Sequence, residues 1–334
     1  MEPAEPQLSL ENVPCNLCGG NDTVLHYRGR DTRFETTPRM EFEVHRCRRC
    51  GLIFLNPRPT GASLGLFYPD SYNVYNQPIE EPEPTGRGGL AGLNDRLWRR
   101  IAGMKLREKQ RLITQYCPQP GRLLDVGCAS GKFLAAMKTV GWDIAGLEMS
   151  ALAVERARQA LGPVVEQGTL ETAPWPENSF DVVTLFHVLE HVPDPVGALR
   201  RIRWLLRPGG IVVVLVPNGA SWEFRVLGQR DSNPLEIPRH FYHYTPATLR
   251  GLASKADLEV LKIKPFSWNV TPRLTGVLQH RLQKWSPSSS AGRAMRSLGM
   301  LGAWGVGMAM ATVTGQLAGK GPGFYLVARK RTVV

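Results

Sequence analysis

Four cysteines near the N-terminus are arranged in two pairs that could bind one metal ion. Cys15 and Cys18 form one CxxC pair, Cys47 and Cys50 form the second, and glycine follows each pair. Two thiolates at this spacing can turn onto the same ion, and two such pairs complete a tetrahedral zinc site. Four thiolates leave no open coordination position, so we expect this zinc to be structural. The alternative, a disulfide, would require an oxidising compartment.

A second group of residues that could do chemistry lies in the middle of the chain. An apolar run carrying one acid, Asp125, leads into the turn GCASG, and a helical pattern starts at Lys132. Such a strand, turn and helix sets backbone N–H groups against a ligand. Glycine at both ends of the turn, Gly127 and Gly131, lets the ligand approach the backbone closely. About 20 residues later Glu148 ends a second short strand, where such folds hold ribose hydroxyls.

The order of four segments in this chain resembles the class I S-adenosylmethionine-dependent methyltransferases. Their first motif is matched by 124–131, their second-strand acid by Glu148, their fourth strand by 180–191 and their fifth by 209–217. One departure is Ala129, which stands where the usual pattern has a middle glycine and should fit the turn with a negative φ. The resemblance implies an α/β fold with a Rossmann-like seven-stranded sheet, and S-adenosyl-L-methionine as cofactor.

The resemblance also assigns residues to the cofactor site. The turn and the following helix should receive the methionine end, with Asp125 ordering the turn, and Glu148 should take the ribose hydroxyls. The segment after the third strand is where the family places the adenine ring. The predicted cofactor-binding residues are Asp125, Gly127, Cys128, Ala129, Gly131, Glu148, Met149, Thr169, Leu170, Phe186 and His187.

Several histidines are candidates for a general base, because imidazole titrates near neutral pH. His240 follows the fifth strand, where ligands bind in open α/β sheets. It also resembles the histidine that serves as base in zinc-ribbon sugar C-methyltransferases. We predict His240 as the first catalytic candidate, with His243 beside it and His187 at the end of the fourth strand as the others. His191 is predicted to be a packing residue.

Hydrophobic periodicity predicts the elements that position these residues. Alternation at 22–27 and 40–45 predicts strands between the cysteine pairs, and strands six and seven are expected at 258–266 and 323–329. The predicted regions are a zinc ribbon at 1–60, an aromatic segment, linker and basic helix at 61–117, and a methyltransferase domain at 118–334 with a hydrophobic helical insertion at 268–322.

Two helix starts carry clear capping signals. Ser150 is a predicted N-cap for a helix over 151–161. Thr245 followed by Pro246 is another, because proline suits the first helical position.

The charge of the chain indicates an anionic partner. The formal net charge is +12 and the isoelectric point is about 9.7, which would suit nucleic acid, a phospholipid surface or a phosphorylated acceptor. The segment 297–319 has no charged residue and approaches the ~20 residues that span a bilayer. Its six glycines favour an interfacial helix, a lid or a dimer contact instead. No signal peptide is evident, so we expect a cytoplasmic protein, with a location peripheral to the membrane and a homodimer both left open.

We therefore predict a methyltransferase that acts on a small-molecule, sugar or lipid-linked glycan acceptor. One alternative is an RNA base methyltransferase, since zinc ribbons and basic surfaces suit RNA. Against it, no Asn/Asp-Pro-Pro-Tyr/Phe motif follows the fourth strand. A second alternative is a non-catalytic cofactor-binding scaffold. A nicotinamide-dependent oxidoreductase is disfavoured, because the turn lacks the GxGxxG spacing.

Overall fold

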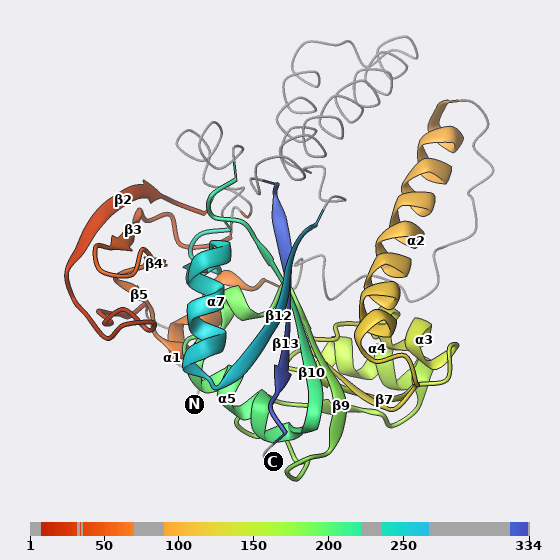
Figure 1. Ribbon diagram of the computed structural model, residues 1–334. Helices are drawn as coiled ribbons and strands as arrows, with labels where there is room; N and C mark the ends of the chain where they lie inside the picture. The colour runs from red at the N-terminus through yellow and green to blue at the C-terminus, as the bar shows by residue number, and fades with distance from the viewer. Residues whose placement is uncertain are drawn as a thin grey trace, which may run out of the picture.

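A seven-stranded sheet runs through the centre of the molecule, with helices on both faces and a smaller sheet at one side (Figure 1). The computed structural model describes residues 8–31, 34, 36–69, 90–221, 236–266 and 321–332. In chain order the central strands are β6 (Arg122–Val126), β7 (Asp143–Glu148), β8 (Val165–Gln167), β9 (Phe180–Phe186), β10 (Leu206–Pro217), β12 (Leu258–Phe266) and β13 (Gly323–Lys330).

The strand order confirms the predicted Rossmann-like methyltransferase sheet. The order is β12-β13-β10-β9-β6-β7-β8, in which β13 runs antiparallel to both of its neighbours and the pairs from β10 to β8 are parallel. Burial on both faces explains the continuous apolar run of β10, where residues 211–216 are all buried. Predicted strands six and seven are confirmed as β12 and β13. The predicted insertion between them, with its uncharged segment 297–319, lies outside the described residues.

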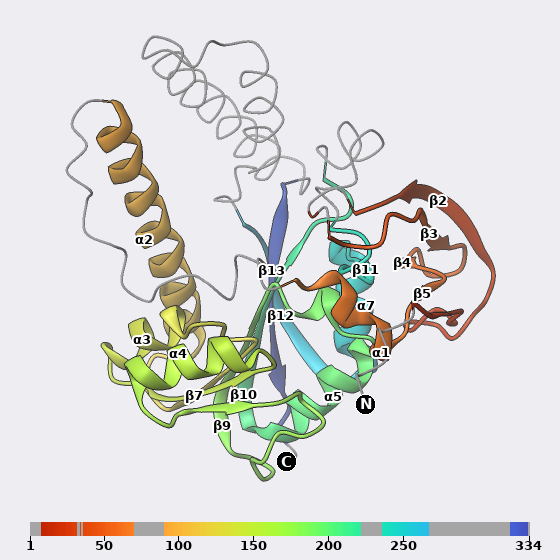
Figure 2. The ribbon, with the colours of Figure 1, turned by 180° about the vertical axis from the view of Figure 1, so that it is seen from behind.

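Helices cover the two faces of the sheet and form two hydrophobic cores (Figures 1 and 2). The predicted cap at Ser150 is confirmed, because its Oγ accepts the Ala153 N–H at 3.4 Å. The cap at Thr245 is also confirmed and forms a capping box with Thr248. One face carries α2 (Leu90–Tyr116), α3 (Lys132–Lys138) and α4 (Ala151–Leu161), and the other carries α5 (Pro195–Leu205) and α7 (Pro246–Lys255).

The smaller sheet is built mainly from the N-terminal cysteine region. Its order is β11-β4-β3-β2, so the strands predicted between the cysteine pairs are confirmed. The fourth strand, β11, comes from the segment that follows β10 in the main domain, and its Tyr242 pairs with Phe54. The part of the chain that follows β10 of the central sheet therefore contributes a strand to the smaller sheet. The strands are β2 (Thr23–Gly29), β3 (Phe42–Cys47), β4 (Ile53–Leu55) and β11 (Tyr242–His243), and a separate pair is formed by β1 (Leu10–Glu11) and β5 (Arg58–Pro59).

A buried ion pair joins the segment before β11 to the N-terminal region. The Arg239 guanidinium donates to the Asp31 carboxylate at 2.5 Å, and neither side chain is exposed. The same guanidinium donates to the Phe67 carbonyl at 3.1 Å. Two charges withdrawn from water stabilise a fold only while each remains paired, so this contact fixes the segment before β11 against the N-terminal region.

Among the described ranges, no helix combines the length and the apolar character needed to cross a bilayer.

Replacing Arg239 should destabilise the protein strongly. Arg239→Met leaves Asp31 as an uncompensated buried charge, so the free energy of unfolding should fall by about 3–5 kcal/mol. Denaturant unfolding measures this change. A matched control is Arg48→Met, which removes an exposed pair with Asp22 and should change stability little. If the two substitutions lowered the free energy of unfolding equally, the buried pair would not hold the segment before β11 against the N-terminal region.

Candidate functional site

The turn after β6 has the left-handed backbone that bares its amide groups. Gly127 has a φ of +67° and Gly131 a φ of +86°. Ala129 was expected to fit the turn if its φ were negative, but its φ is +48°. The reason is a hydrogen bond: in this conformation the Ala129 N–H donates to Glu148 Oε2 at 2.9 Å. Alanine therefore accepts a strained conformation in order to satisfy a buried carboxylate.

Glu148 lies at the end of β7 and connects the turn to the following helix. Its Oε2 accepts from Ala129, and its Oε1 accepts the Ser150 N–H at 2.9 Å. The carboxylate is nearly buried, with 7% of the residue exposed. Each carboxylate oxygen has a further acceptor position, so the geometry fits the predicted contact with ribose hydroxyls, which stays a prediction.

Asp125 lies inside the sheet rather than at its surface. The Thr184 hydroxyl of β9 donates to Asp125 Oδ1 at 2.6 Å. Burial raises the pKa of Asp125 to about 7, against the opposing effects of the Thr184 hydrogen bond and the charge of Lys109. The hydrogen bond between Asp125 and Thr184 thus fixes the end of β6 against β9.

Lys109 of α2 belongs to this site, although it was not among the predicted site residues. Its Nζ lies 3.9 Å from the centroid of the Phe186 ring and 5.7 Å from that of Phe133. Burial lowers the pKa of Lys109 to about 8, and the charge of Asp125 opposes this shift. The signal in the sequence is helical spacing, since Lys109 precedes the buried Leu112 by three residues and so shares its face.

These residues fit a sulfonium nucleotide. A Cβ at Gly127 would overlap the Val188 side chain, so the backbone there has room only for glycine. The Phe186 ring already lies against the Lys109 ammonium, so its face can also interact with the positive charge of a sulfonium. Of the remaining predicted contacts, Cys128 and Leu170 are buried, Met149 is 66% exposed, and the Thr169 N–H donates to the Thr172 hydroxyl. Their contacts with the cofactor stay predictions.

His187 forms a pair with a buried acid at the carboxyl end of β9. It has a φ of +60°, an uncommon conformation for a residue with a side chain. Its Nδ1 lies 3.2 Å from Glu190 Oε1, and its side chain is 39% exposed whereas that of Glu190 is 1% exposed. Strained backbone of this kind is often found at functional sites.

Three histidines, His187, His191 and His240, gather around this acid. The His191 and His240 rings lie 4.6 Å apart, nearly perpendicular, and both residues are close to Glu190. His191 Nδ1 lies 2.9 Å from the Tyr68 hydroxyl and 3.1 Å from the Arg239 carbonyl. Burial lowers the pKa of His191, while the charge of Glu190 opposes this effect. His191 was predicted to be a packing residue, and its place in this cluster was not predicted.

His240 and His243 are both nearly buried. His240 is 7% exposed, and His243, on β11, is 4% exposed. Their ring centroids lie 6.2 Å apart. The structure thus places His240 in the histidine cluster and His243 in the smaller sheet, and the catalytic role predicted for each stays a prediction.

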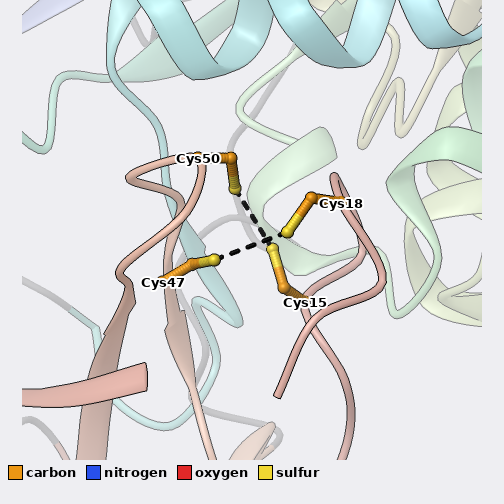
Figure 3. Close-up of side chains that lie close together, drawn as sticks. All are labelled: Cys15, Cys18, Cys47 and Cys50. Atoms are coloured by element: carbon orange, nitrogen blue, oxygen red, sulfur yellow. Dashed lines mark hydrogen bonds between the residues drawn. The ribbon is translucent and has the colours of Figure 1, made fainter. Parts of the chain in front are cut away.

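The four N-terminal cysteines converge as their spacing predicts (Figure 3). The Sγ atoms of Cys15 and Cys50 lie 3.4 Å apart, and those of Cys18 and Cys47 lie 3.5 Å apart. All four sulfur atoms lie within 4.8 Å of one another. Four thiols at the corners of so small a volume fit a tetrahedral zinc ion.

Known proteins resemble the central part of this chain. Residues 97–263 match the family described as methyltransferase domain. A ubiquinone biosynthesis O-methyltransferase from Alkalilimnicola ehrlichii is 36% identical over 160 residues, which is 44% of this chain and 64% of that protein. The enzyme of the same name from Thiobacillus denitrificans is 32% identical over 172 residues, 48% of this chain and 74% of the relative.

A putative sarcosine dimethylglycine methyltransferase from Galdieria sulphuraria has a TM-score of 0.47 and 18% identity, and the match covers 81% of this chain and 99% of that structure.

Gly127→Ala should weaken cofactor binding. The new Cβ would meet Val188 in a left-handed backbone, so the turn must move, at a cost of about 1–3 kcal/mol in folding stability. Denaturant unfolding and calorimetric titration with S-adenosylmethionine measure the two effects. Gly61→Ala is the control, because a Cβ there has nothing within 4 Å and φ is not left-handed. Unchanged affinity in Gly127→Ala would show that the cofactor does not approach this turn.

Asp125→Asn should flatten the dependence of stability on pH. The folded pKa of Asp125 is about 7, above the value of about 3.9 in an unfolded chain. The folded state therefore retains a proton that the unfolded state releases, and wild-type stability should fall between pH 4 and pH 7 by up to ~1.4 kcal/mol per pH unit. Asparagine keeps an oxygen for Thr184 and removes the titration.

Urea unfolding at several pH values tests this expectation. Asp143→Asn is a suitable control, because Asp143 starts β7 with its side chain 71% exposed. If the Asp125→Asn curve runs parallel to that of the wild type, the raised pKa is refuted.

Proposed function

Because this chain belongs to the methyltransferase domain family, we propose that it transfers a methyl group from S-adenosylmethionine to a hydroxyl oxygen of a small molecule. The observation that carries the proposal is the position of the His187–Glu190 pair beside the glycine turn. Val188, the residue after His187, packs against Gly127. A proton acceptor and the bare backbone turn therefore share one corner of the sheet.

The cofactor, when bound, supplies a methyl group already activated by its sulfonium, so the protein has to position the acceptor, exclude water and remove the hydroxyl proton. The turn amides would hold the methionine end, and Glu148 would accept from the ribose hydroxyls. Phe186 and Lys109 form a wall from α2 and β9. The Lys109 ammonium is placed to meet the negative charge of the methionine carboxylate.

His187 is the residue best placed to take the acceptor proton. Its Nδ1 faces the Glu190 carboxylate at 3.2 Å, so Nδ1 carries the proton and Nε2 has the lone pair. Glu190 orients the ring and would stabilise the imidazolium that forms. His187 is also the more exposed of the histidines in the cluster, whereas His240, the first candidate from the sequence, is nearly buried.

The acceptor we favour is a phenol-like hydroxyl rather than a sugar hydroxyl. An imidazole titrates near 6.5 and a phenol near 10, so this base can assist a phenol more effectively than a less acidic alcohol. The names of the relatives, O-methyltransferases of ubiquinone biosynthesis, agree with oxygen as the methylated atom. A sugar or lipid-linked glycan remains the second acceptor class to test.

We further propose that the four N-terminal cysteines bind a structural zinc. Their convergence supports this proposal, as does the buried position of Cys15 and Cys47 at the base of the smaller sheet. Because β11 completes that sheet, the ion would stabilise the segment that carries His240.

His187→Ala should lower kcat by about 10²- to 10⁴-fold, the usual contribution of a general base, and leave the affinity for S-adenosylmethionine nearly unchanged. Transfer of labelled methyl to a panel of phenols, catechols and sugar nucleotides measures the rate, and calorimetry measures the affinity. His26→Ala, at an exposed site on β2, is the matched control. A protein that takes up no S-adenosylmethionine would refute the proposal, and an active His187→Ala variant would assign the base elsewhere.

A further inference from the structure

We infer that Glu190, His191 and His240 form a second metal site, which takes one divalent transition-metal ion on the acceptor side of the sheet. One potential ligand atom from each of the three residues lies within 4.8 Å of the others. Two imidazoles and one carboxylate are a donor set that suits zinc, cobalt and iron, and three protein ligands leave at least one coordination position open.

The Glu190 carboxylate gives the first independent reason for a cation here. Glu190 is completely buried. Its Oε1 faces His187, but within the described part of the chain its buried Oε2 has no hydrogen-bond partner. A buried carboxylate oxygen without a partner is costly, and a metal ion between Glu190 and the two imidazoles would remove that cost.

The hydrogen bonds of His191 give the second reason. His191 Nδ1 lies 3.1 Å from the Arg239 carbonyl, which can only accept a hydrogen bond, and 2.9 Å from the Tyr68 hydroxyl, which can accept as well, so a proton on Nδ1 satisfies both contacts. The lone pair of the ring is then on Nε2. Histidines that bind metals commonly donate their other ring N–H to a carbonyl or carboxylate in this way, which fixes both the tautomer and the ring orientation.

The backbone holds the two ligand-bearing segments together. The Phe241 N–H donates to the Glu190 carbonyl at 2.9 Å, and the Tyr244 hydroxyl donates to the Leu189 carbonyl at 3.0 Å. These bonds join η3 (Leu189–His191) to the segment that carries His240. The ligands are therefore positioned before any ion arrives, as a tight site requires.

The site also has a chemical role that rests on the proposed function. An acceptor hydroxyl on the open coordination position would become more acidic, because the ion withdraws electron density from its oxygen. His187 Nδ1 lies 3.2 Å from an oxygen of the same Glu190 carboxylate, so the proposed base and the proposed ion would share this acid. The metal-binding site itself does not depend on this role.

Metal uptake by the full chain tests the inference without any acceptor. The protein is first stripped with a chelator and given one equivalent of zinc, which the four thiolates should retain, because soft sulfur ligands favour zinc. Cobalt(II) is then titrated and followed by visible absorption. We expect one further equivalent, with ligand-field bands and without the sulfur-to-metal charge-transfer bands of a thiolate site.

Variants then assign the site. His240→Ala and Glu190→Gln should each weaken cobalt binding by at least about tenfold, while the control His26→Ala should bind as the wild type does. Affinity for S-adenosylmethionine, measured in parallel, shows that each variant is folded. Absence of a saturable second equivalent, a thiolate spectrum for it, or unchanged binding in the folded variants would each overturn the inference.

The outcome is separable from that of the proposed function. Cobalt uptake with no methyl transfer to any acceptor would sustain the metal site and refute the function. Methyl transfer by a protein that takes up only one metal ion would do the reverse.

Discussion

The buried pair of Arg239 and Asp31 imposes the constraint on which the acceptor side depends. Its charges can remain in an apolar interior only if the N-terminal sheet and the segment before β11 stay together. Arg239 also supplies the carbonyl that bonds to His191, and its neighbour in the chain is His240. The segment that this ion pair holds in place therefore also carries the carbonyl that contacts His191 and, next to it, His240.

The cofactor side depends on a different use of charge. Glu148 satisfies two backbone N–H groups and so holds Ala129 in a left-handed conformation that alanine would otherwise avoid. Close by, Asp125 and Lys109 are both withdrawn from water, and burial shifts the pKa of each toward its neutral form. A carboxyl group, an amino group and an aromatic ring buried close together are suited to a ligand that carries both signs of charge.

Glu190 connects these two sides. Its Oε1 lies 3.2 Å from Nδ1 of His187, which precedes the residue that packs on the glycine turn. A Glu190 carboxylate oxygen also lies within 4.8 Å of a ring nitrogen of His191 and of His240. A single buried carboxylate can thus influence proton transfer and cation binding together.

Local spacing was enough to predict many of the chain's regular elements and its cluster of four cysteines. The CxxC pairs, the GCASG turn, the caps at Ser150 and Thr245 and the bounds of β12 depend on residues near one another in sequence, so their patterns are readable there. Tertiary structure alone decided the rest. Arg239 meets Asp31 across 208 positions and Tyr68 meets His191 across 123, and the φ of Ala129 follows from a carboxylate 19 residues away. Contacts at such separations depend on how sheets and helices pack, so the periodicity of the sequence cannot predict them.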